Sequence, residues 1–99
     1  MNRIEAFQAS VAREEAPPAD LGAALKALWW DMKGDWHRAH EATQDDAGTD
    51  VSWVHAYLHR KEGDLSTAGY WYGRAAKPVG EGGLDEERDA ILGELLRPD

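Results

Sequence analysis

Two histidines stand one helical turn apart near the middle of the chain. His55 and His59 are four residues apart, so on a helix they share a face and can hold one metal ion. A third ligand would have to come from His40, Glu62 or elsewhere. No glutamate follows His55, so the His-Glu-x-x-His pattern of metalloproteases is missing. The favoured interpretation is that both histidines border the core and bond to a carboxylate or the backbone, and we assign no metal and no cofactor.

A second group combines aromatic rings with cations. Tyr70, Arg74 and Lys77 recur at i, i+4 and i+7, outside the apolar stripe of a predicted helix. Residues 49–77 carry four basic and three acidic side chains, a net charge of +1, which leaves −9 for the rest of a chain whose total is −8. An anionic peptide or ligand could dock on such a segment, with arginine supplying paired hydrogen bonds. The favoured alternative is that cations near helix C-termini simply suit the helix dipole.

The composition argues against several classes of function. A net charge of −8 disfavours nucleic-acid and anionic-membrane binding, because both need a cationic surface. The sequence has no cysteine, which excludes a disulfide framework and any cysteine-based metal site or nucleophile. No apolar run is long enough for a transmembrane helix or a signal peptide, so we expect a cytoplasmic protein. No serine or threonine has the setting of an activated nucleophile, which favours a non-catalytic role.

Helices must position all of these residues. Apolar residues recur with helical spacing, and no alternating strand pattern occurs. We therefore predict an all-α fold of about six helices in a single domain over residues 1–99. Residues 1–16 should form an N-terminal helix, residues 20–77 two antiparallel helical hairpins, and residues 84–97 a C-terminal capping helix.

Glycine and aspartate mark the predicted helix ends. Gly34 and Gly63 should end helices in the left-handed conformation. The predicted N-caps are Asp20, Asp35, Asp50, Asp64 and Asp85. In the second helix of the second hairpin the predicted inner face is Leu65, Ala68, Tyr72 and Ala75. Gly69 and Gly73 lie on another face of that helix; since helical glycine costs about 1 kcal/mol relative to alanine, we expect another backbone to approach closely there.

The chain contains an internal repeat. Residues 27–39 and 56–68 align without gaps, and both carry Gly-Asp, an apolar residue, two variable positions and alanine. This frame resembles the tetratricopeptide and Sel1-like short helical repeats. The resemblance implies stacked hairpins, with a groove lined by the first helix of each hairpin. On that basis the residues that face the groove are Trp53, Tyr57, Arg60 and Lys61.

A second resemblance covers about a quarter of the chain. The run His-Ala-Tyr-Leu-His-Arg-Lys-Glu-Gly-Asp, followed by Tyr-Trp-Tyr, is similar to a run shared by a group of small bacterial proteins with no assigned function. It implies no activity.

Two hypotheses about function remain open, and a metal site at the histidines is a third possibility. The first is a non-catalytic interaction module that binds a protein or peptide segment, or self-associates as a homo-oligomer, through Trp53, Tyr57, Arg60, Tyr70 and Arg74. The second is a small-molecule-binding protein or enzyme whose polar centre is His55, His59 and Arg74. Convergence of these three side chains on a cavity would favour the second hypothesis.

Overall fold

The computed structural model describes residues 2–44, 46 and 48–97. Over these residues the chain forms six α-helices and no strand, which confirms the all-α prediction. The helices are α1 (Arg3–Arg13), α2 (Ala23–Lys33), α3 (Trp36–Thr43), α4 (Thr49–Glu62), α5 (Leu65–Ala75) and α6 (Leu84–Leu95). None of the helices in the described part of the chain is both long and apolar enough to cross a membrane.

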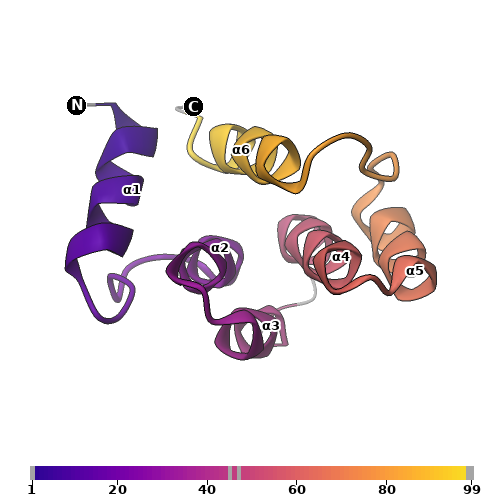
Figure 1. Ribbon diagram of the computed structural model, residues 1–99, viewed down its shortest axis with the longest axis horizontal. Coiled ribbons are helices and arrows are strands. Elements are labelled where there is room, and N and C mark those ends of the chain that lie inside the picture. The colour runs from indigo at the N-terminus through magenta and orange to yellow at the C-terminus, as the bar shows by residue number, and fades with distance from the viewer. Residues whose placement is uncertain (1, 45, 47, 98–99) are drawn as a thin grey trace.

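The helices form an array with α4 at its centre. α2–α3 and α4–α5 are two hairpins that lie next to each other, with α1 at one end of the array and α5 at the other (Figure 1). α4 packs against α2, α3, α5 and α6, whereas the main contacts of α5 are with α4 alone. The chain then returns, and α6 lies across α2 and α4. Half of the residues of α4 are therefore buried, which is more than the one apolar face of this helix that the sequence predicts. The buried residues are Val51, Ser52, Val54, His55, Ala56, Tyr57 and Leu58.

The two glycine–aspartate corners have nearly the same geometry. Gly34 (φ 93°, ψ 14°) and Gly63 (φ 93°, ψ 5°) are left-handed, as predicted. The aspartate that follows each glycine donates its backbone N–H to a carbonyl of the preceding turn, at 2.9 Å in the first corner and 3.0 Å in the second. Each of these aspartates, Asp35 and Asp64, also caps the next helix by accepting a backbone N–H with its carboxylate. One residue pair thus ends one helix and starts the next.

Three of the predicted caps are wrong. The N-caps of α2, α4 and α6 are Gly22, Gly48 and Gly83, none of which makes a side-chain capping bond. Asp50 and Asp85 lie two residues after these N-caps, in the first turn of their helices, where their charges still suit the positive helix end. Asp20 belongs to a turn closed by the Leu21 N–H on the Pro18 carbonyl, so α2 starts later than predicted.

Two expectations about α5 are also wrong. Among the described residues, apart from the chain neighbours and the backbone of α5 itself, no heavy atom lies within 4 Å of a Cβ built on Gly69 or Gly73, so no other helix approaches closely there. Leu65 is 67% exposed, although Ala68, Tyr72 and Ala75 are buried as predicted. The reason is the position of α5 at the end of the array, where no helix of the described part of the chain packs against its outer side.

Candidate functional site

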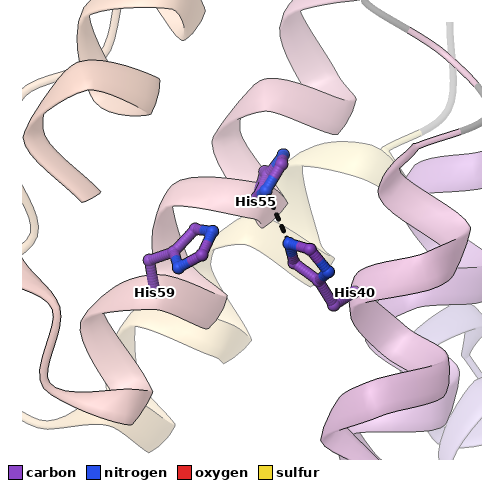
Figure 2. A group of neighbouring side chains, drawn as sticks. All are labelled: His40, His55 and His59. Carbon is purple, nitrogen blue, oxygen red and sulfur yellow. Dashed lines mark hydrogen bonds between the residues drawn. The ribbon is translucent and has the colours of Figure 1, made fainter. Parts of the chain in front are cut away.

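Three histidines meet where α3 packs against α4. His40 comes from α3, and His55 and His59 from successive turns of α4 (Figure 2). The Nε2 atoms of His40 and His55 are 3.0 Å apart, a hydrogen bond in which one ring donates and the other accepts. One ring nitrogen from each of the three residues lies within 4.8 Å of the other two. The three side chains therefore form a single polar cluster, which we call the histidine cluster.

Indole rings fix the histidine cluster from two sides. Trp36 stacks on His40 with ring centroids 5.0 Å apart and an interplanar angle of 7°. Trp71 stacks on His55 at 4.0 Å and 18°. The Trp36 indole is itself held by a 2.9 Å hydrogen bond from its Nε1 to the carbonyl oxygen of Leu58. These contacts set the ring orientations and place apolar walls beside the nitrogens.

The surroundings keep two of the imidazoles neutral at physiological pH. His55 is 7% exposed, and burial, aided by the neighbouring His40 and His59, lowers its pKa to about 4. Burial and His59 also lower the pKa of His40, against the opposing charge of Glu62. The ring nitrogen Nδ1 of His59 pairs with Oε1 of Glu62 at 2.7 Å, so a neutral His59 donating there leaves Nε2 as an acceptor.

The predicted binding residue Tyr57 lies in the core. It is 1% exposed, and its hydroxyl donates a 2.8 Å hydrogen bond to Oδ2 of the buried Asp31. Burial and the Asp31 carboxylate both raise the pKa of Tyr57. The expectation that Tyr57 faces an open groove is wrong, because α4 is covered on several sides.

Arg60 and Lys61 are both paired with carboxylates of neighbouring helices. Arg60 pairs with Glu87 at 2.9 Å, and the two side chains are only 14% and 8% exposed. It also donates to the carbonyl of Gly82 in the loop before α6. Lys61 donates to the other oxygen of Asp31 at 2.7 Å. These two cations link α4 to the loop before α6, to α6 itself and to α2, instead of lining a groove.

The remaining predicted residues lie at separate places. Trp53 is half-buried under Lys77, whose Nζ is 4.3 Å from the indole centroid, and it lines a cavity of about 290 Å³ with the loop that follows α5. Tyr70 is 58% exposed on the outer side of α5. Arg74 donates to the Tyr70 hydroxyl at 3.1 Å and lies 5.7 Å from the ring centroid of Trp71.

The predicted binding residues are thus divided among the core, the histidine cluster and the surface. His55 and His59 converge, but the contacts of Arg74 are with Tyr70 and Trp71, so Arg74 is not part of the cluster. His40, Trp36 and Trp71 were absent from the predicted binding set although they complete the cluster. The available signal was the spacing of Trp36 and His40, which predicts that both lie on one face of α3.

Comparisons with protein-family models, with curated proteins and with solved structures each give no significant match. The resemblance to short helical repeats and the resemblance carried by residues 53–75 therefore stay predictions.

Proposed function

We propose that the protein is a non-catalytic interaction domain that binds an acidic segment of another protein on the outer side of α5. The observation that carries this proposal is the setting of Arg74. In a chain with a net charge of −8, this exposed arginine rests against two aromatic rings. Within residues 2–44, 46 and 48–97 it pairs with no carboxylate.

Exposed apolar side chains on α5 and in the loop after it support an interface in this part of the molecule. The large hydrophobic residues most exposed in the described part of the chain are Leu65, Tyr70 and Val79, at 67%, 58% and 61%. All three lie on α5 or in the loop that follows it. Tyrosine, tryptophan and arginine are the side chains that most often supply binding energy at protein interfaces.

Charge selects the kind of partner. The guanidinium of Arg74 is held by Tyr70 and Trp71, so it loses little freedom when a carboxylate binds. An acidic segment would be repelled by most of this molecule and attracted by the α5 surface, which fixes its position. Arginine on a carboxylate can add paired, charge-assisted hydrogen bonds.

Calorimetric titration with a short Glu/Leu peptide, compared with a Lys/Leu peptide of equal length, tests the proposal. The acidic peptide should bind more tightly, and Arg74→Glu should weaken it at least about tenfold, since a charged hydrogen bond contributes about 1.5–3 kcal/mol. Arg13→Glu is the matched control, because Arg13 is exposed on α1 at the opposite end of the array.

Two results would overturn this proposal. One is equal affinity for the two peptides, or equal losses in the Arg74→Glu and Arg13→Glu variants. The other is a dimer in sedimentation experiments that Arg74→Glu disrupts, which would assign the α5 surface to a second copy of the chain.

The convergence of His40, His55 and His59 favours a second candidate function, the binding of a small ligand at the histidine cluster. Arg74 is not part of this candidate ligand site, because its contacts are with Tyr70 and Trp71.

A further inference from the structure

The spacing of the histidine cluster is close to that of a metal site. In a tetrahedral site with metal–nitrogen bonds of about 2.0–2.1 Å, two ligand nitrogens are about 3.3 Å apart. The Nε2 atoms of His40 and His55 are 3.0 Å apart, and the nitrogens of all three residues lie within 4.8 Å of one another. The widest pair has to approach by at most about 1.5 Å, which small rotations of the rings can supply.

The ring nitrogens can offer their lone pairs to one ion. In the His40–His55 hydrogen bond one Nε2 carries the proton and the other accepts it. If the donor ring moves its proton from Nε2 to its own Nδ1, both Nε2 atoms present lone pairs to the same point, and no net proton is lost. A neutral His59 that donates its Nδ1–H to Glu62 needs no such change, because its Nε2 is then free to coordinate.

The contacts around the histidine cluster match those that support metal ligands. A histidine ligand commonly donates its second ring N–H to a carboxylate, which orients the ring and makes it a better donor to the metal. Glu62 stands in that position beside His59, with Oε1 and Nδ1 2.7 Å apart. Trp36 stacks on the imidazole of His40, and Trp71 stacks on that of His55. Each of the three rings therefore has a neighbouring side chain that holds its orientation.

The histidine cluster has ring nitrogens that the protein itself leaves available to a ligand. Between the three rings there is one hydrogen bond, and the described residues supply no hydrogen bond to Nε2 of His59. No buried side-chain nitrogen or oxygen of the described residues lacks a partner, so the nitrogens without one are within reach of solvent. A bound cation would engage all three lone pairs at once.

The ligand set selects the class of ion. Imidazole nitrogens bind zinc, copper, nickel and iron, whereas calcium and magnesium require oxygen ligands. The sequence has no cysteine that could supply a thiolate. Three nitrogens leave the fourth position of a tetrahedral ion for water or another ligand.

We propose that His40, His55 and His59 bind one first-row transition-metal ion, represented by Zn²⁺, between α3 and α4. This inference selects His40 as the third ligand, where the sequence left His40 and Glu62 open, and for this chain it replaces the expectation of no metal.

Direct titration of the wild-type protein tests the metal site without any substitution. Protein freed of metal by a chelator should take up one Zn²⁺ per chain in competition with a chromophoric chelator, and Ca²⁺ or Mg²⁺ should not compete. Co²⁺ should give the visible absorption of a four-coordinate ion. It should also quench tryptophan fluorescence, because Trp36 and Trp71 lie against two of the proposed ligands.

Substitutions locate the ion. His55→Gln should weaken Zn²⁺ binding at least about a hundredfold, and Glu62→Gln about 10–100-fold. His37→Gln is the matched control, since His37 is an exposed histidine of the same helix as His40 and should leave binding unchanged. Circular dichroism establishes that each variant is folded, and the wild-type titration stands on its own if His55→Gln is not.

Several outcomes would overturn the metal site. They are fewer than one Zn²⁺ per chain, equal binding of Ca²⁺, unchanged Zn²⁺ affinity in folded His55→Gln, or a loss of affinity in His37→Gln. Arg74→Glu should retain full Zn²⁺ binding, so failure of the metal site and failure of the α5 surface are separate results.

Discussion

The two hairpins share a corner but differ in what covers it. Both turn at a left-handed glycine followed by a capping aspartate, and both place a buried alanine at the equivalent position, Ala39 and Ala68. The residue directly after each corner has opposite surroundings. Trp36 is half-buried against the histidine cluster, whereas Leu65 is 67% exposed.

The difference shows that the glycine–aspartate corner determines how the chain turns, but not whether the side chains after it are buried. α3 lies between α2 and α4, so its face toward α4 becomes the wall of a polar cluster. At the positions of α5 equivalent to Trp36 and His40 the chain has Leu65 and Gly69. Among the described residues the main helix contacts of α5 are with α4 alone, and Leu65 stays exposed. The same corner is therefore followed by a covered face in α3 and by an open one in α5.

The largest expected difference between the hairpins is at the position after the corner. Trp36→Ala should lower the free energy of unfolding by about 3 kcal/mol, because it opens a cavity and removes the hydrogen bond to the Leu58 carbonyl. Leu65→Ala should change it by less than about 0.5 kcal/mol, since the side chain is exposed. Urea denaturation measures both values. Similar losses in the two variants would contradict the comparison.

Acid should destabilise the junction between the hairpins. The pKa of His55 is lowered to about 4 in the folded protein, from 6.5 in the unfolded chain. Between these values the unfolded chain binds more protons, so stability is complete above pH 6.5 and falls as the pH drops toward 4. In metal-free protein the free energy of unfolding should fall by about 2 kcal/mol between pH 7 and pH 5.

The same denaturation experiment on His55→Gln should show a much smaller fall with pH. His37→Gln should behave as wild type, because His37 is exposed on α3. An undiminished pH dependence in His55→Gln would show that His55 is not the group responsible.

The two corners should respond equally to loss of glycine. Gly34 and Gly63 both have φ 93°, and neither has a neighbour within 4 Å that an added Cβ would meet. Gly34→Ala and Gly63→Ala should therefore each cost only the backbone strain, about 1 kcal/mol. Thermal unfolding of the two variants side by side measures the costs. A clear inequality would show that the corners are not equivalent.

The end of α5 offers the smallest effect, and one of opposite sign. There the left-handed residue is Ala76, with φ 56° and ψ 41°, not a glycine. Ala76→Gly should relieve strain and stabilise the protein by about 0.5 kcal/mol, after the larger entropy of the unfolded glycine chain is subtracted. An unchanged midpoint of thermal unfolding would show that the left-handed backbone at Ala76 is not strained.

Short-range signals in the sequence were sufficient for the helical class and the two corners, but not for the starts of α2, α4 and α6. Glycine and aspartate act on backbone groups within one turn, so Gly34-Asp35 and Gly63-Asp64 were predicted from their neighbours alone. Burial was harder, because it depends on which helices become neighbours. Tyr57 was expected in a groove and Leu65 in the core. The packing of α4 and α5 instead buries Tyr57 and leaves Leu65 exposed.

The histidine cluster was only half visible for the same reason. The spacing of His55 and His59 within one helix can be seen in the sequence. The position of His40 depends on how α3 crosses α4, which no local pattern encodes. The aromatic stacking that orients the cluster also joins residues from α3, α4 and α5.

The first and last helices meet at their outer ends. Arg3 near the start of α1 donates to the carbonyl of Leu96 just after α6, and Figure 1 shows the start of α1 and the end of α6 at the same side of the molecule. A short peptide could join the start of α1 to the end of α6, and new ends could be opened in the loop between α5 and α6. Such a circular permutant would keep every helix in place while changing the order in which the helices leave the ribosome.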